Sequence, residues 1–352
     1  MTADQMPDRL GPYRLLERIG EGGMGVVFLA ADAAERKVAL KVLRSSVAGE
    51  PTARRRLARE VETMRRVRSP YVAEVIGADL AGDMPYIVTR YVPGRTLEQV
   101  VTEGGPLPGP DLLRLACGLA DALAAVHAAG VVHRDLKPGN VMLLNGLPVV
   151  IDFGIAQGPD ATRLTMTGMF MGTPGYLAPE VIEGSPSSEA SDVHAWGATV
   201  AFAATGHPPF GTGAYEAVFY RIVNGRPSLD AVPAPLQPLL AAALARDPAR
   251  RPLAVQLSAR AAMLDPGTLV PGNILGLGEG MAAPATLVEA AYGILAPPGD
   301  GLGLAGAPPA GLPGIHGPGV AGLGAAAGLV PPGTRPLATG KPPPADFADV
   351  LP

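Results

Sequence analysis

The stretch that most constrains the fold is residues 131–154, VVHRDLKPGNVMLLNGLPVVIDFG, in which charged residues alternate with short apolar runs. The apolar runs 141–144 and 149–151 are separated by NGLP at 145–148, a pattern that predicts a short buried hairpin. Polar residues just outside the hairpin are then expected to face one cleft: Asp135, Asn140 and Asp152. Such a group of carboxylates and amides in a cleft indicates an active site.

A glycine-rich turn, GEGGMG, occupies residues 20–25 between two strand-like segments. Without side chains, its glycines would let the backbone approach a phosphate. On its own this spacing is weak evidence, and an ordinary glycine hairpin stays an alternative for the motif alone. A dinucleotide site would need a helix opening at the third glycine, whereas Val26-Val27-Phe28 continues as a strand.

Lys41 follows the strand-like run Val38-Ala39-Leu40, where a lysine on the buried side needs an anionic partner or a phosphate. Residues 52–67 have the periodicity of a helix, and Glu60 falls inside its apolar stripe. A carboxylate that faces the core requires a cation, so we expect an ion pair between Lys41 and Glu60. Many arginines in this region favour a solvated helix face, with a phosphate or partner patch as the alternative: Arg54, Arg55, Arg56, Arg59, Arg65, Arg66 and Arg68.

Further along, residues 85–94 predict a strand that ends in an extended linker, whose backbone groups stay free to bind a ligand. Residues 111–129 predict a helix that stops at Gly130 and leads into the stretch at 131–154. Residues 191–204 predict a helix that is apolar on all sides, and therefore central, with Gly206 as its stop.

Taken together, these segments resemble the eukaryotic-like (Hanks-type) serine/threonine protein kinases of bacteria over residues 13–264. HRDLKPGN at 133–140 resembles the kinase catalytic loop, and DFG at 152–154 resembles the metal-binding triplet. GTPGYLAPE at 172–180 resembles the substrate-platform motif G-T-x-x-Y-x-A-P-E and is the most specific stretch of the chain. The resemblance implies an α+β, two-lobed protein-kinase fold, with an antiparallel sheet and one helix in the N-lobe and a mainly helical C-lobe.

The resemblance also implies roles for individual residues. Asp135 would orient the substrate hydroxyl and accept its proton, Lys137 would offset charge on the transferred group, and Asn140 and Asp152 would hold Mg²⁺ or Mn²⁺. Residues of the turn, the strands and the linker would bind ATP: Ile19, Gly20, Glu21, Gly22, Gly23, Met24, Gly25, Val27, Ala39, Lys41, Glu60, Thr89, Arg90 and Val92.

Regulatory and scaffold roles follow from the same resemblance. Thr165, Thr167 or both would be autophosphorylated in the activation loop, and Arg134 would then bind the new phosphate. Thr173 would belong to the substrate platform. Asp192 would brace the catalytic loop, and Glu180 would pair with Arg251.

Two other classes of function share some of these residues. A small-molecule phosphotransferase of the same fold has no need for the platform at 173–180. A pseudokinase scaffold is disfavoured because the residues needed for transfer are all present: Lys41, Asp135, Asn140 and Asp152.

The domain organisation predicted for the 352 residues has three parts: an N-terminal extension at 1–12, a kinase domain at 13–265 with lobes that meet near residue 92, and a disordered tail rich in Gly and Pro at 266–352. A net charge of −4 gives no general basic field for nucleic acid, and the single Cys117, expected in the core, excludes an intramolecular disulfide. With no apolar run of about 18 residues, we expect a cytoplasmic protein without a membrane partner. Its expected partners are protein substrates and a second copy during autophosphorylation.

Overall fold

The computed structural model of the chain describes residues 7–44, 51–154 and 173–269. The chain divides into two units, residues 1–279 and 280–352, and every described residue belongs to the first unit. The predicted phosphorylation sites Thr165 and Thr167 and the tail beyond residue 269 lie outside the described residues.

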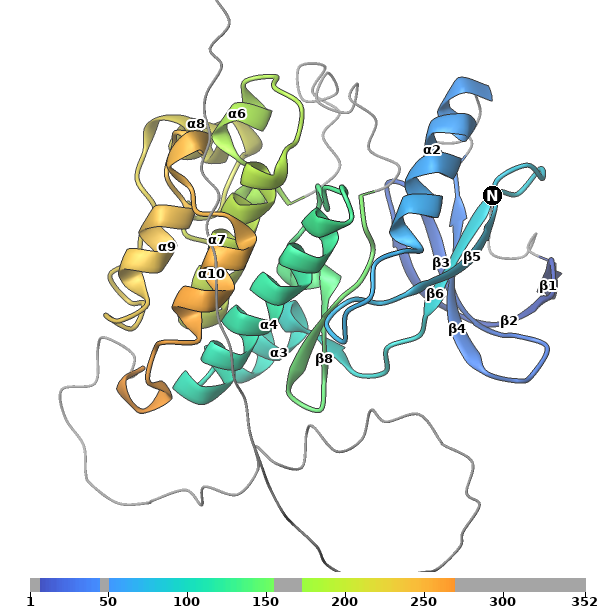
Figure 1. Ribbon diagram of the computed structural model, residues 1–352, viewed down its shortest axis with the longest axis horizontal. Coiled ribbons are helices and arrows are strands. Elements are labelled where there is room, and N and C mark those ends of the chain that lie inside the picture. Colours follow the sequence, from blue (N-terminus) through green and yellow to red (C-terminus); the bar gives the residue numbers. More distant parts are fainter. Residues whose placement is uncertain (1–6, 45–50, 155–172, 270–352) are drawn as a thin grey trace, which may run out of the picture. The chain divides into compact units, whose positions relative to one another are not determined.

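A six-stranded antiparallel sheet forms the N-terminal part, with strand order β1-β2-β3-β4-β6-β5 (Figure 1). Its strands are β1 (Arg9–Leu10), β2 (Tyr13–Gly22), β3 (Gly25–Ala31), β4 (Lys37–Leu43), β5 (Val75–Asp79) and β6 (Tyr86–Arg90). The sheet begins at Arg9, which pairs with Arg14, so it extends into the segment predicted as an N-terminal extension. A strand of only two residues has too little alternation to be found in a sequence.

The alternation of side chains along β4 gives the sheet two different faces. Val38, Leu40 and Val42 are buried in an apolar cluster that also includes residues of β3 and β6. Ala39 and Lys41, one position out of phase, line a cavity on the other face. The register of this strand therefore determines that Lys41 points into the cavity.

Helix α2 (Pro51–Met64) is the one described helix between β4 and β5 in the chain. Its predicted apolar stripe is confirmed, because Leu57, Val61 and Met64 are each at most 5% exposed. Glu60 lies on the edge of that stripe, with about a quarter of its side chain exposed. The helix thereby presents a carboxylate toward residues of the C-terminal part.

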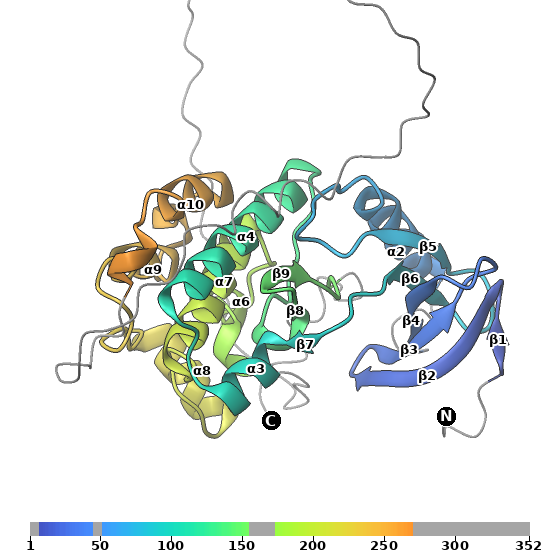
Figure 2. The ribbon, with the colours of Figure 1, turned by 90° about the horizontal axis from the view of Figure 1, so that it is seen from below.

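The C-terminal part consists mainly of helices, seen from below in Figure 2. They are α3 (Leu97–Gly104), α4 (Gly109–Ala128), α6 (Pro179–Ile182), α7 (Glu189–Thr205), α8 (Tyr215–Asn224), α9 (Gln237–Ala243) and α10 (Ala254–Ala261). Helix α7 is buried on all sides, as predicted, from Ser191 to Ala204, and it ends at Gly206 with a left-handed φ of 78°. Within the described ranges, no helix is both long and apolar enough to cross a membrane.

A second sheet of three strands carries the predicted hairpin, in the order β7 (Arg95–Thr96), β8 (Val141–Leu144) and β9 (Leu147–Val150). Asn145 and Gly146, with φ of 52° and 78°, form a turn tighter than the four-residue connection that was predicted. Positive φ at both positions is the geometry that favours Asn-Gly in a two-residue hairpin.

The packed C-terminal part continues beyond the predicted domain boundary at residue 265. A 3-10 turn at Pro266–Thr268 packs against α4, and the following Leu269 is 2% exposed. A side chain on Gly109 would collide with the carbonyl oxygen of Leu269, at 2.4 Å. The first residues of the predicted tail, Pro266–Thr268, are thus part of a structured turn.

Candidate active site

A cavity of about 670 Å³ lies between the six-stranded sheet and the helical part. It brings together most of the predicted site residues: Ile19, Gly20, Glu21, Gly22, Gly23, Met24, Gly25, Val27, Ala39, Lys41, Thr89, Arg90, Val92, Arg134, Asp135, Lys137, Asn140, Asp152, Thr173 and Asp192. Glu60, Glu180 and Arg251 do not line it.

The glycines of the turn between β2 and β3 are needed for two different reasons. A side chain on Gly22 would meet nothing within 4 Å, so this glycine leaves space over the cavity. A side chain on Gly25 would lie 2.0 Å from the carbonyl oxygen of Val42, so this glycine is required by the close approach of β4. Gly25 is therefore required by packing although it also lines the cavity, whereas the absence of a side chain at Gly22 serves only to leave space.

Asp135 is held in place by neighbours in its own loop. Lys137 donates from Nζ to both carboxylate oxygens of Asp135, at 2.8 and 2.9 Å. Asn140 donates from Nδ2 to the same carboxylate at 2.9 Å and to the Asp135 carbonyl at 2.7 Å. These contacts fix one carboxylate in a cavity, ready to accept a proton.

The backbone of this loop is braced from the central helix. Asp192 on α7 is 1% exposed and accepts hydrogen bonds from the N–H groups of His133, at 2.7 Å, and Arg134, at 2.8 Å. A third partner, His127 at the end of α4, lies 2.9 Å from the same carboxylate through Nε2. The sequence analysis missed His127, although a polar residue next to the buried Val126 was a usable signal.

The charged pairs differ from the predicted arrangement. Lys41 pairs with Asp152, with 2.6 Å between Nζ and Oδ1, and Glu60 pairs with Arg134, at 3.1 Å. The predicted pair between Lys41 and Glu60 is therefore wrong for this structure. The helical pattern showed that Glu60 faces inward, but two cations lie within reach of the site, and the sequence does not say which one it meets.

Two residues of these pairs also have unusual backbones. Arg134 and Asp152 have φ of 70° and 59°, in the left-handed region that residues with side chains rarely adopt. Such conformations cost energy and concentrate where the direction of a side chain matters. Here they aim the Arg134 and Asp152 side chains at their ion-pair partners.

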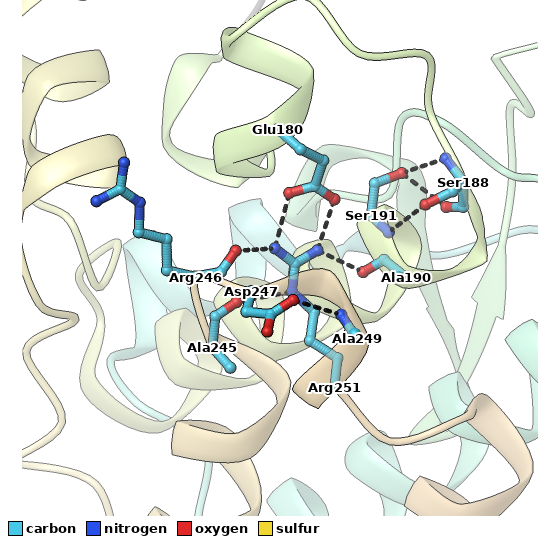
Figure 3. A network of polar contacts seen from close by, with 9 residues as sticks. All are labelled: Glu180, Ser188, Ala190, Ser191, Ala245, Arg246, Asp247, Ala249 and Arg251. Carbon is cyan, nitrogen blue, oxygen red and sulfur yellow. Dashed lines mark hydrogen bonds and ion pairs between the residues drawn. The ribbon is translucent and has the colours of Figure 1, made fainter. Parts of the chain in front are cut away.

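Away from the cavity, Glu180 and Arg251 form the predicted pair (Figure 3). The guanidinium contacts both carboxylate oxygens at 2.7 Å and also donates to the carbonyls of Ala190, Ala245 and Arg246. All five N–H groups of this fully buried side chain thus have acceptors. The pair joins the helix that follows the platform, α6, to the turn before α10.

Two further residues, the buried His133 and the half-buried Cys117, take no part in the proposed chemistry. Burial lowers the pKa of His133, whose ring packs against Phe153 with centroids 4.8 Å apart. Burial also raises the pKa of the Cys117 thiol to about 11, so little thiolate forms at neutral pH. Both residues therefore contribute packing, as the sequence predicted for Cys117.

The oxygen atoms of Asn140 and Asp152 suit a magnesium ion that is also bound by the substrate. Among the described residues, no group of three or more His, Cys, Asp or Glu could hold a metal alone. Asn140 uses its amide nitrogen on Asp135, which leaves its oxygen available, and Asp152 has 36% of its side chain exposed. Mg²⁺ is commonly held by one or two protein oxygens together with substrate phosphates.

Residues 13–261 match the protein kinase domain family. The chain is 45% identical over 258 residues to the serine/threonine-protein kinase AfsK of Streptomyces coelicolor, covering 73% of this chain and 32% of that protein. It is 44% identical over 254 residues to the probable serine/threonine-protein kinase PkwA of Thermomonospora curvata, covering 72% of this chain and 34% of the relative. The chain thus spans about a third of the length of these relatives.

A solved structure is similar in fold: Rad53 1-466 in complex with AMP-PNP, with a TM-score of 0.61 and 22% identity. The similarity covers 72% of this chain and 66% of that chain. At this level of identity it shows the fold, and the predicted two-lobed architecture is confirmed.

Proposed function

Because this chain belongs to the protein kinase domain family, we propose that it transfers the γ-phosphoryl group of ATP to serine and threonine hydroxyls of proteins. The observation that carries the proposal is the geometry of Asp135. Its carboxylate is fixed by Lys137 and Asn140 in the same cavity as the pair of Lys41 and Asp152. This arrangement provides a proton acceptor, two cations and metal-binding oxygens around one space.

ATP would enter between the glycine turn and the linker after β6. Within the described part of the chain, no hydrogen-bond partner is found for the N–H of Val92, which lines the cavity. That group and the neighbouring carbonyl of Arg90 can therefore bind the edge of an adenine. The open space over Gly22 would admit the phosphates, and Lys41 would contact the α and β phosphates.

Asn140 and Asp152 would hold Mg²⁺, or Mn²⁺, through their oxygens. The bound ion would neutralise charge on the phosphoryl oxygens. For Asp152 this role requires its carboxylate to share or give up its contact with Lys41, which it makes at 2.6 Å.

The transfer itself asks the protein mainly for positioning. Asp135 would accept a hydrogen bond from the substrate hydroxyl, whose oxygen forms a bond to the γ phosphorus while the bond to the β-phosphate oxygen breaks. The hydroxyl proton passes to Asp135, and ADP leaves. Lys137, which already contacts Asp135, would offset negative charge on the moving group. Thr173 at the cavity edge would position the peptide.

Activity on proteins is tested by incubating the full chain with radiolabelled ATP, Mg²⁺ and a generic basic protein. The wild type should label serine and threonine, whereas Asp135→Asn, which keeps the size of the side chain, should label neither. Labelling of an aminoglycoside in place of the protein would favour the small-molecule alternative. Nucleotide binding without any transfer by the wild type would favour a pseudokinase.

Phosphorylation of Thr165 or Thr167 would activate the enzyme by exchanging ion-pair partners. A phosphate carries about −1.5 to −2 charges and so competes with the single carboxylate of Glu60 for Arg134. Glu60 would then be released to pair with Lys41, which in turn frees Asp152 for the metal.

Mass spectrometry of the wild type beside Asp135→Asn tests the modification, and kinetics of the Thr165→Ala, Thr167→Ala variant test its effect. Phosphate on residues 155–172 is expected only in the active protein, and the double variant should be at least about tenfold slower, or about 1.4 kcal/mol. An unmodified but fully active wild type would refute the activation scheme without affecting the proposed transfer.

The remaining proposals concern the protein in the cell: autophosphorylation between two copies, protein substrates as partners, and a cytoplasmic location. Mixing active enzyme with a tagged Asp135→Asn copy tests the first. Phosphate on the inactive copy would support transfer between molecules.

A further inference from the structure

A second cavity, of about 650 Å³, lies on the sheet-bearing part of the molecule. It is lined by the turn between β3 and β4, residues at and just after the end of α2, the start of β5 and the end of β6. It shares only Val75 and Arg90 with the lining of the candidate active site. We call it the basic groove.

Cations outnumber carboxylates in the basic groove by six to three. The cations are Arg36, Lys37, Arg65, Arg66, Arg68 and Arg90, and the carboxylates are Asp32, Glu62 and Glu74. Each carboxylate is already paired with one arginine, at 2.8 Å to Arg36, 3.5 Å to Arg65 and 3.1 Å to Arg68 respectively. Three cations are thus left over.

Lys37, Arg66 and Arg90 have no carboxylate partner among the described residues. They belong to three different segments of the chain, so they are not the exposed face of one helix. Lys37 and Arg66 are exposed, whereas Arg90 is half-buried and donates to the carbonyl of Val72 at 3.4 Å. The excess positive charge therefore results from the tertiary fold, and it is directed into a concave surface.

We propose that the basic groove binds a phosphorylated serine or threonine segment of a partner protein, with the phosphate contacting Lys37 and Arg66. A phosphate dianion forms strong charge-assisted hydrogen bonds with arginine and lysine. Ile76, which is 40% exposed in the lining, offers an apolar contact beside the charges. A cavity of this size falls in the range of roughly 300–1,000 Å³ typical of sites for ligands much larger than one ion.

The proposal extends the proposed function without depending on it. A protein that makes phosphoserine and phosphothreonine works among partners that carry them, and the groove would hold such a partner outside the active-site cavity. Binding needs no phosphoryl transfer, so it can be measured with an inactive enzyme. The test therefore separates failure of this proposal from failure of the proposed kinase activity.

Fluorescence anisotropy of the full chain carrying the inactivating Asp135→Asn substitution provides the test, with a labelled peptide that contains one phosphothreonine flanked by leucines. The same peptide without phosphate, and with glutamate in place of phosphothreonine, are the comparisons, at a fixed ionic strength and without ATP, whose phosphates would compete for the groove. The phosphorylated peptide should bind at least about tenfold tighter than the unphosphorylated one.

The Lys37→Glu, Arg66→Glu variant should lose that preference. Its matched control is Arg226→Glu, Arg260→Glu, which makes the same change in charge at exposed residues of the helical part and should bind like the wild type. Thermal unfolding checks that both variants fold. If the charge-reversal variant of the groove does not fold, Lys37→Gln, Arg66→Gln replaces it, because it removes the two positive charges with a milder change.

Equal binding of phosphorylated and unphosphorylated peptides would overturn the proposal. So would unchanged binding by both groove variants, or an equal loss in the control, which would indicate general electrostatic attraction. Displacement of the peptide by inorganic phosphate at the peptide's own concentration would show that the groove recognises the ion alone.

Discussion

Replacement of Asp152 tests the site most directly. Asp152→Asn keeps the size of the side chain but removes the charge that pairs with Lys41 and would bind the metal. We expect at least a tenfold loss in turnover, which corresponds to about 1.4 kcal/mol in the barrier. The stability of the fold should change little.

Turnover with a generic substrate and thermal unfolding measure these two effects. Asp230→Asn, a substitution of the same kind at an exposed residue, is the control and should be fully active. An Asp152→Asn enzyme that keeps more than about a tenth of the wild-type turnover would show that Asp152 does not hold the metal.

The lowered pKa of His194 makes the free energy of unfolding depend on pH. Burial, together with the nearby Arg251, lowers its pKa from 6.5 to about 3, and its ring stacks on Phe210. Below pH 6.5 the unfolded chain binds a proton at this residue and the folded protein does not, so acid favours unfolding. The free energy of unfolding should fall by about 1.4 kcal/mol per pH unit from this residue, between pH 6.5 and about 3.

Urea unfolding of His194→Phe and wild type at several pH values isolates this contribution. The variant should lose that part of the slope, whereas His207→Phe, at an exposed histidine, should keep it. Parallel curves for His194→Phe and the wild type would contradict the assignment.

Among the elements, the connection between α6 and the turn before α10 depends on one buried ion pair. Arg251→Ala leaves Glu180 with no cation and breaks five hydrogen bonds, so we expect a loss of about 3–5 kcal/mol in the free energy of unfolding. Arg246→Ala breaks the exposed pair with Glu183 and should cost at most about 1 kcal/mol. Chemical denaturation of both variants makes the comparison.

If Arg251→Ala does not fold, Arg251→Lys can replace it, because it keeps the charge but not the two parallel contacts to Glu180. That variant should still be clearly less stable than Arg246→Ala. Equal stability of the two would mean that the buried pair contributes no more than the exposed one.

Elements with strong local patterns were predictable from the sequence. The all-apolar run and the terminal glycine gave α7, and Asn-Gly between apolar runs gave the hairpin of β8 and β9. The pairing of Glu60 was not predictable, because periodicity assigns a side chain to a face without naming its partner across the cavity. The basic groove was only partly predictable: the arginines near α2 were a candidate phosphate or partner patch, but the other cations, Arg36, Lys37 and Arg90, come from segments up to 54 residues apart.

At the scale of the whole molecule, the folded domain extends at least to Leu269, which is buried. A chain that stops after residue 272 should keep its activity and stability if the tail is dispensable, as its composition suggests. A chain that stops at residue 264 loses the buried Leu269 and the turn before it, and should be less stable by at least about 1.5–3 kcal/mol.

Activity on a generic substrate and thermal unfolding of the two truncated chains make this comparison. Leu269→Ala in the full chain controls for the truncation itself and should also be destabilised. Lost activity in the chain that ends at residue 272 would show that the tail contributes to catalysis.

The small side chain of Thr89 has a consequence for pharmacology. The active-site cavity is lined by Arg90 and Val92, which follow Thr89, and also by Ile87, two residues before it on β6, and by Leu43 at the end of β4, so the lining extends along β6 past the threonine. An ATP-competitive inhibitor can carry an aromatic group into that space, where a larger residue would exclude it. Cells that express Thr89→Met in place of the wild type would then resist the compound, and their resistance would identify this protein as its target.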